Sequence, residues 1–213
     1  MTTEEYLQLY RRSDEDIRLI QEYNAKLIDK YPFLKPHNRW SDDIEEPYDY
    51  HFTEMDAMPE GWRIAFGDQL LEELEAELEK FNCQHGYRIM QIKEKFGGLR
   101  WYDSGVPIGK LSDVIETVTF DDWKDAPKTD NENIWRLVNK EDNKYTYEHI
   151  KILEKCKVHD IINKYEILSE KICIFCGKPA EVITTGWITP LCTECYKKHC
   201  DGEHYKTVEE WFK

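Results

Sequence analysis

The stretch CIFCGKPAEVITTGWITPLCTEC, residues 173–195, decides how the C-terminal part of this chain folds. It holds two Cys-x-x-Cys pairs that are separated by fifteen residues. Two such pairs at this spacing can place four thiolates around one tetrahedral metal ion, and zinc suits this ligand set. The sequence therefore predicts one structural zinc site with the ligands Cys173, Cys176, Cys192 and Cys195.

The residues between and after the two pairs predict the unit that holds the metal. AEVITTGWITPL (180–191) has the β-branched residues and central turn of a hairpin, and CTECYKKHC (192–200) predicts a short helix. Knuckle, hairpin, knuckle and helix in this order are typical of a zinc-ribbon or treble-clef module, here over residues 171–213. Because four cysteines complete the coordination sphere, the zinc ion would stabilise the fold and would not activate water. Alternative ligands are His199, Cys200 and His204.

A second informative stretch, QIKEKFGGLRWYDSG (91–105), predicts a β-hairpin. Gly97-Gly98 would form its two-residue turn, because primed turns need positive φ. This turn pairs Phe96 with Leu99, and the alternation of side chains then defines two faces. The apolar face would pack on the helices and comprises Met90, Ile92, Phe96, Leu99 and Trp101. The opposite face is a cationic plate of Lys93, Lys95, Arg100 and Tyr102, with Gln91 beside them.

The cationic plate has two interpretations. Lys95 and Arg100 would lie opposite each other, and like charges in this arrangement repel unless an anion neutralises them. The plate could therefore bind a phosphate, a nucleotide or an acidic segment of a partner. It could equally be neutralised by acidic residues of the same chain, and the sequence leaves both interpretations open.

The rest of the chain predicts an α+β fold in which helices pack on a small antiparallel sheet. Helices are expected over residues 3–12, 14–30, 60–81 and 146–168. Short strands are expected within 41–59 and at VIETVTF (114–120). We expect an α+β body over residues 1–170, with 109–155 as an insertion, followed by the zinc module at 171–213.

Charge is distributed unevenly along the chain, whose formal net charge is −14. Residues 41–80 contain fourteen acidic residues and two cations, so nearly the whole imbalance lies there. This field repels nucleic acids and acidic membranes and attracts basic surfaces. The loop within it predicts an acidic partner surface that comprises Asp42, Asp43, Glu45, Glu46, Asp49, Tyr48 and Tyr50, with Phe52 as a further aromatic residue. The alternative is an ordinary solvated acidic surface.

The composition is that of a folded protein from a reducing compartment. Aromatic residues make up 13%, which argues against disorder despite the mean hydropathy of −0.74. The seven cysteines are an odd number and four have metal spacing, so no disulfide framework is expected. The sequence shows no secretion signal and no apolar run of membrane-spanning length. We therefore expect a cytoplasmic location and no membrane association.

Several segments together are similar to a known group of proteins. After YPFLKPHNRW (31–40) come MPEGWRIAF (58–66), QIKEKFGGLRWYDSG (91–105), INKYEILSEKICIFCGKPA (162–180) and GWITPLCTEC (186–195). In this order they resemble a family of uncharacterised small proteins of bacteria, prophages and phages. The resemblance implies a compact α+β body with a zinc-bearing tail, and a phage or mobile-element context. It implies no activity and no catalytic residues.

Three functions remain open at this point. The first is a non-enzymatic interaction protein of phage or mobile-element type that binds, and could inhibit, a basic host protein involved in defence or in nucleic-acid handling. The second is a nucleic-acid-binding accessory protein that uses the zinc module at 171–213, a zinc finger, together with the cationic plate. Against it, residues 171–213 hold six lysines, six acids and no arginine. The third is an enzyme, which is less favoured because no nucleophile elbow, catalytic metal motif or nucleotide fingerprint is present.

Overall fold

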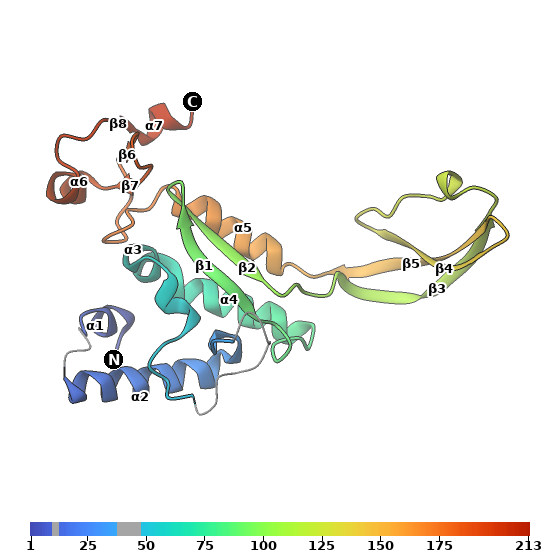
Figure 1. The fold of residues 1–213 in the computed structure, drawn as a ribbon, viewed down its shortest axis with the longest axis horizontal. Helices are drawn as coiled ribbons and strands as arrows, with labels where there is room; N and C mark the ends of the chain where they lie inside the picture. Colours follow the sequence, from blue (N-terminus) through green and yellow to red (C-terminus); the bar gives the residue numbers. More distant parts are fainter. Residues whose placement is uncertain (10–12, 38–47) are drawn as a thin grey trace. The chain divides into compact units, whose positions relative to one another are not determined.

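The computed structural model describes residues 1–9, 13–37 and 48–213 (Figure 1). As expected, the fold is α+β, with small antiparallel sheets and a C-terminal four-cysteine region. The chain divides into two compact units, residues 1–105 together with 158–213, and residues 106–157. The predicted insertion at 109–155 and the predicted domain boundary after residue 170 stay predictions, because they concern which parts of the chain fold independently.

Helices α1 (Thr3–Leu7) and α2 (Asp14–Lys30) open the first unit. Ser13 caps α2, because its hydroxyl accepts a hydrogen bond of 3.0 Å from the Asp16 amide. The predicted bounds of this helix are confirmed. The helix predicted over 3–12 ends at Leu7, and residues 10–12 lie outside the described ones. After α2 the chain turns through a short 3-10 helix, η1 (Pro32–Leu34).

One long helical segment carries the main apolar stripe of the first unit. It starts as α3 (Glu60–Trp62), continues through a π-helical turn, η3 (Arg63–Gly67), and ends as α4 (Asp68–Lys80). The predicted helix at 60–81 is thus confirmed, with the π-turn as an added feature. Its buried stripe comprises Trp62, Phe66, Leu70, Leu74 and Leu78. This stripe packs toward α5 (Val158–Ser169), where the Phe66 and Tyr165 rings lie 5.3 Å apart.

The described part of the acidic segment before α3 contains a 3-10 turn instead of a strand. This turn, η2 (Glu54–Ala57), begins after Thr53, whose amide donates to the Asp56 carboxylate at 2.7 Å. The strand predicted within 41–59 is therefore wrong for residues 48–59. Local capping gives this backbone hydrogen-bond partners without a neighbouring strand.

The predicted β-hairpin is confirmed as β1 (Ile89–Lys95) and β2 (Gly98–Asp103), but its turn lies one residue earlier and its cross-strand pairing is shifted by two residues. Phe96 and Gly97 form the turn, with φ of 54° and 75°. Every cross-strand pair therefore changes, but by an even number of residues, so Ile92, Leu99 and Trp101 still share one face and Lys93, Lys95 and Arg100 the other. Phe96 leaves the predicted apolar face and is 69% exposed.

Helix α5 fixes this register by contacts that a local pattern cannot show. The Leu99 amide donates to the Ser169 hydroxyl at 2.8 Å, and the Trp101 amide donates to the Glu166 carboxylate at 2.9 Å. These bonds satisfy the outer edge of β2. The hydrogen bonds to Ser169 and Glu166 therefore outweigh the preference of Gly98 for a turn position.

The second unit is a three-stranded antiparallel sheet. Its strands are β3 (Gly109–Phe120), β4 (Asn133–Glu141) and β5 (Lys144–Lys155) in the order β3-β5-β4, with the 3-10 turn η4 (Trp123–Asp125) between β3 and β4. The strand predicted at 114–120 is confirmed. The helix predicted over 146–168 is wrong in its first half, because residues 144–155 form β5 and α5 starts at Val158.

A tight turn explains why the first half of that predicted helix is extended. Asp142 and Asn143 both have positive φ, 45° and 62°, and connect β4 directly to β5. Such a turn matches the twist of a two-stranded hairpin. Tyr145 and Tyr147 then alternate with polar residues along β5, as a strand requires.

The C-terminal finger follows the predicted order of elements. Strands β6 (Val182–Thr184) and β7 (Pro190–Leu191) form the hairpin between the cysteine pairs, and helix α6 (Thr193–His199) follows. Strand β8 (Tyr205–Thr207) adds to the free side of β6, giving the order β7-β6-β8, and the short helix α7 (Val208–Trp211) ends the fold. Figure 1 shows this small sheet next to α6, at one end of the first unit.

Candidate metal centre and binding groove

The four predicted cysteines come together at one point of the finger. The Sγ atoms of Cys173, Cys176, Cys192 and Cys195 lie within 4.8 Å of one another, and three of these cysteines are buried. Zinc–sulfur bonds of about 2.3 Å in a tetrahedron space the sulfurs by about 3.8 Å. The Cys176 and Cys192 sulfurs are 3.6 Å apart, and all seven cysteines of the chain are free thiols. The cluster therefore has the donor set and spacing of a metal site.

Each half of the cluster lies on a backbone turn that directs amides toward it. In the first knuckle, the Lys178 backbone donates a hydrogen bond to the Cys176 sulfur. Gly177 in the same turn has φ of 75°, which a residue with a Cβ rarely adopts. In the second knuckle, Cys192 caps α6, and the Cys195 amide donates to its sulfur at 3.4 Å. Amides placed in this way stabilise negative charge on sulfur.

The alternative ligands named above do not join the cluster among the described residues. The His199 ring stacks instead on the Phe175 ring, with centroids 4.4 Å apart.

Burial, reinforced by the neighbouring thiols, raises the pKa of Cys195. Four thiolates at this spacing also repel one another, so a bound cation is what would hold them together.

Helix α3 lies in direct contact with the first knuckle, which the sequence analysis missed. The Gly61 amide donates to the Ile174 carbonyl at 2.9 Å, and the Trp62 indole donates to the Ile172 carbonyl at 3.0 Å. A Cβ on Gly61 would lie 2.3 Å from the Cys173 carbonyl oxygen. A glycine at the start of a strong helical pattern, here Gly61, indicates in a sequence that another backbone approaches the helix closely.

The residues of the predicted cationic plate lie on one face of the hairpin, with new pairing. Lys93 lies opposite Arg100 on the neighbouring strand. The Lys93 ammonium lies 4.9 Å from the centroid of the Tyr102 ring. The Arg100 guanidinium donates to the Leu99 carbonyl at 2.7 Å. Within the described parts of the chain, neither these two cations nor Lys95 forms an ion pair with a carboxylate.

The hairpin turn and the finger together line a groove of about 460 Å³. We call it the hairpin–finger groove; its lining residues are Glu94, Lys95, Phe96, Thr185, Gly186, Trp187 and Ile188. Phe96 is 69% exposed and Trp187 is 77% exposed. A Cβ on Gly97 would lie 2.8 Å from the Ile188 side chain, so the tip of the hairpin touches the finger. Neither Trp187 as a surface residue nor this groove is predicted by the local sequence pattern.

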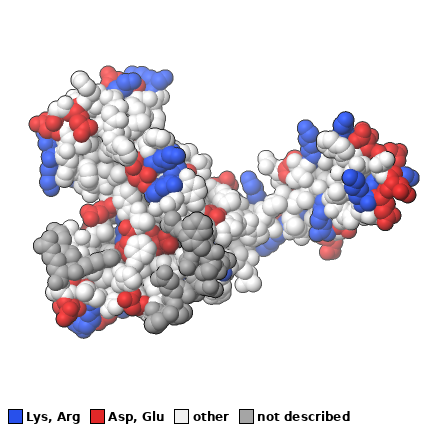
Figure 2. All heavy atoms as spheres, in the orientation of Figure 1, with Lys and Arg blue, Asp and Glu red and all other residues white. Residues whose placement is uncertain are grey.

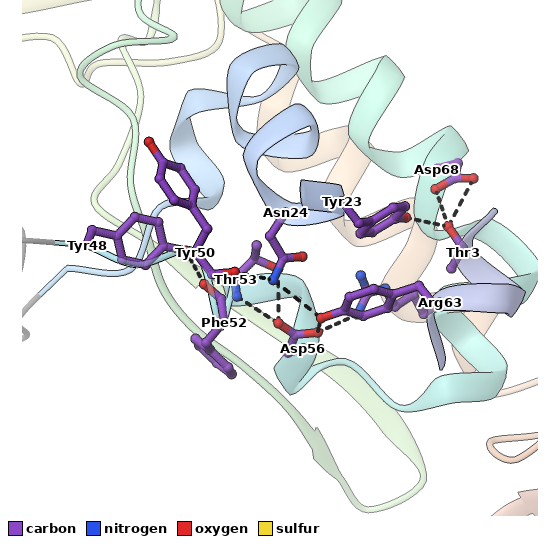
Figure 3. A network of polar contacts seen from close by, with 11 residues as sticks. Thr3, Tyr23, Asn24, Tyr48, Tyr50, Phe52, Thr53, Asp56, Arg63 and Asp68 are labelled. Atoms are coloured by element: carbon purple, nitrogen blue, oxygen red, sulfur yellow. Dashed lines mark hydrogen bonds and ion pairs between the residues drawn. The ribbon is translucent and has the colours of Figure 1, made fainter. Parts of the chain in front are cut away.

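The predicted acidic partner surface is described only in part. Outside the described residues lie Asp42, Asp43, Glu45 and Glu46. Asp49 is exposed and contacts His51, while the Tyr48 hydroxyl donates to the Phe52 carbonyl (Figure 3). The carbonyl of Tyr50 accepts a 2.9 Å hydrogen bond from the Asn24 side chain. Tyr50 is therefore tied to α2 through its backbone carbonyl, while the Tyr48 hydroxyl is bonded within the loop.

A buried ion pair anchors the end of the same loop. The Arg63 guanidinium and the Asp56 carboxylate lie 2.7 Å apart, and their side chains are 3% and 9% exposed. The Tyr6 hydroxyl donates to the same carboxylate at 2.7 Å. Burial, with the Asp56 charge beside it, raises the pKa of Tyr6, so the hydroxyl stays protonated and continues to donate. Figure 3 shows Asp56 and Arg63 meeting between η2 and η3.

Several acids of the neighbouring helix also have partners within the chain. Glu73 accepts from Lys164 at 2.7 Å and from Tyr165 at 2.9 Å, and the Lys164 hydrogen bond lowers the pKa of Glu73. Further contacts join Asp68 to Thr3, Glu72 to Lys30 and Glu77 to Lys80. These acids contribute to the fold of the first unit as well as to its charge.

Comparisons and surface charge leave the metal cluster as the best-supported site. Figure 2 shows acidic and basic side chains mixed over this face of the finger, in keeping with its six lysines and six acids. In the described part of the chain, no helix is long and apolar enough to cross a membrane. No protein-family model, curated protein or solved structure matches this chain. The resemblance to phage and prophage proteins therefore stays a prediction.

Proposed function

We propose that this chain is a non-enzymatic interaction protein whose finger is held together by one structural zinc ion. The observation that carries the metal is the set of four thiols within 4.8 Å of one another. Four thiolates complete the coordination sphere of zinc, so no position stays open for water or a substrate. Metal binding would instead contribute folding free energy, on the order of 10 kcal/mol in small zinc modules.

The surface beside the cluster supports binding as the function. Phe96 of the hairpin and Trp187 of the finger are largely exposed, and both line the hairpin–finger groove. Exposed aromatic side chains around a hollow are typical of recognition sites, where aromatic residues often supply most of the binding energy. The finger would then act as a rigid support for one wall of the binding surface.

Metal analysis tests the first part of the proposal. Purified protein is expected to contain one zinc ion per chain, and Cys176→Ser should lose it. Cys83→Ser is the matched control, because Cys83 lies outside the cluster. Protein that is folded by circular dichroism but holds no zinc, and whose stability chelators leave unchanged, would overturn the structural-zinc proposal.

A second candidate surface follows from the charge of the chain. With fourteen acids against two cations in residues 41–80, we propose that a basic protein is a partner, and that a phage or mobile element could use such binding to inhibit a host protein. A tagged pull-down from a bacterial lysate, with and without nuclease, tests this. A stoichiometric basic protein should survive nuclease and be lost when Asp42, Asp43, Glu45, Glu46 and Asp49 are neutralised. Recovery of nucleic acid would favour the accessory-protein alternative.

A further inference from the structure

We propose that the hairpin–finger groove receives an acidic segment of a partner protein that carries an apolar side chain at its centre. This inference rests on the proposed interaction function and adds the chemistry of the occupant. It concerns a different surface from the acidic segment at 41–80, so the two sites can be tested separately.

The walls of the groove favour an apolar side chain. Phe96, Trp187 and Ile188 are three of its seven lining residues, and the hollow of about 460 Å³ lies between them. Removing such surface from water is favourable in proportion to the apolar area that is buried. An aliphatic or aromatic side chain of a partner would bury both exposed aromatic rings at once.

Backbone strain at Phe96 is an independent observation that favours recognition. Its φ of 54° lies in the left-handed region, which costs a residue with a Cβ about 1–2 kcal/mol. A primed turn prefers asparagine or glycine at this place. The fold gains little packing in return, since the side chain is 69% exposed. An exposed aromatic residue held in an unfavourable backbone conformation is the pattern of a binding residue.

Charge beside the groove favours an acidic occupant. Lys95 lines the groove, and Lys93 and Arg100 continue the cationic plate from it along the hairpin. Glu94 also lines the groove, but its carboxylate accepts the Gly97 amide hydrogen bond at 2.7 Å. One further acid, Glu170, lies beside Gly98 in the same region. Because the three cations have no carboxylate partner among the described residues, acids of a partner would gain charge-assisted contacts there.

The metal cluster determines one wall of the groove without contacting the occupant. Thr185 to Ile188 form the turn between β6 and β7, the hairpin that joins the two cysteine knuckles. The Thr189 hydroxyl donates to the Trp187 carbonyl at 3.2 Å and helps to hold this turn. Loss of the metal should therefore remove binding at the groove even though no ligand atom reaches the cluster.

Selection from a library of random dodecapeptides tests the occupant directly on the zinc-loaded full chain. The selected peptides should share an apolar residue flanked by Asp or Glu. Their affinity should fall at least about tenfold with Trp187→Ala and with Phe96→Asn. Phe96→Asn keeps a residue suited to positive φ, so a folding defect is not the reason for a loss. Trp123→Ala is the matched control, since this tryptophan is 58% exposed in the second unit, and it should leave affinity unchanged.

Other outcomes would overturn the inference in recognisable ways. Selected peptides rich in Lys and Arg, or peptides whose affinity ignores both groove variants, would show that the groove does not recognise acidic segments. A concentration-dependent dimer of the wild type that Trp187→Ala abolishes would assign the groove to a second copy of the chain. Stoichiometric zinc together with no selected peptides would refute the groove and leave the structural-zinc proposal intact.

Discussion

Substitution of Gly61 by alanine should destabilise the first unit, although alanine is the better helix former. Gly61 lies in α3 and is helical, where replacing glycine by alanine ordinarily stabilises by about 1 kcal/mol. Here an added Cβ would lie 2.3 Å from the Cys173 carbonyl oxygen and 2.7 Å from the Gly177 nitrogen. Both are backbone atoms of the metal knuckle, which cannot rotate away as a side chain would. The two effects have opposite signs, so the sign of the result decides between them.

The expected loss can be worked from the contacts at this junction. Overpacking against a rigid neighbour costs about 1–3 kcal/mol. Relief of the clash needs the knuckle to move away, which would also weaken the Gly61 amide to Ile174 carbonyl bond and the Trp62 indole to Ile172 carbonyl bond. Each such bond contributes about 0.5–1.5 kcal/mol. After subtraction of the helix-propensity gain, Gly61→Ala should cost about 1–5 kcal/mol.

Thermal and urea unfolding of the zinc-loaded protein measure this loss. A change of this size lowers the midpoint by about 2–4 °C per kcal/mol in a chain of this length. Gly86→Ala is the matched control, because the nearest atom to its added Cβ is 3.8 Å away, an ordinary contact. The control should change stability by less than about 0.5 kcal/mol. A Gly61→Ala protein as stable as the wild type, or more stable, would refute the docking of α3 on the knuckle.

Three further predictions concern the turn, the buried ion pair and a surface carboxylate. Phe96→Asn should raise stability by about 0.5–1 kcal/mol in urea unfolding, because Asn-Gly suits the primed turn that Phe96 strains, and a loss would contradict the observed register. Asp56→Asn should cost about 3–5 kcal/mol, since it leaves the buried Arg63 charge without its partner; a loss below about 1 kcal/mol would show that this pair is solvated. The hydrogen bond from Lys164 lowers the pKa of Glu73 in the folded state. The contribution of Glu73 to the stability of the fold is therefore complete above its unfolded pKa of about 4.3, and it is lost as the pH falls through the lower folded pKa. Glu73→Gln should accordingly flatten the fall of stability below about pH 5, measured by unfolding at stepwise lower pH, and an unchanged slope would exclude this contribution.

The parts of the fold that the sequence predicted well are those set by local chemistry. Ser13 and the acids after it begin α2 where they were expected to, because capping depends only on neighbouring residues. The two cysteine pairs meet for a similar reason, since a hairpin of this length can only bring the knuckles together. Spacing within a short stretch was sufficient for both.

The parts that could not be predicted depend on partners far along the chain. The hairpin register is fixed by Ser169 and Glu166, which accept from β2 amides across more than sixty residues. The sequence of β5 predicts a helix because the spacing of Ile150, Leu153 and later apolar residues also fits a helical face. The Asp142–Asn143 turn is the opposing signal, because two successive residues of this type favour a hairpin and not a continuous helix.

The finger is part of the first unit because glycines allow it to approach the body closely at two places. At one, the backbone of Gly61 meets the first knuckle; at the other, Gly97 brings the hairpin turn against Ile188. A side chain at either position would push the finger away, and each of the segments 58–66, 91–105, 162–180 and 186–195 contains residues of one of these two junctions. A metal ion bound by the four thiols would fix the finger side of both junctions, so docking of α3 and the shape of the hairpin–finger groove would depend on the same cluster. A structural zinc ion in this position would therefore control binding by holding the two junctions in place together, which is why a site with no open coordination position can still be essential to function.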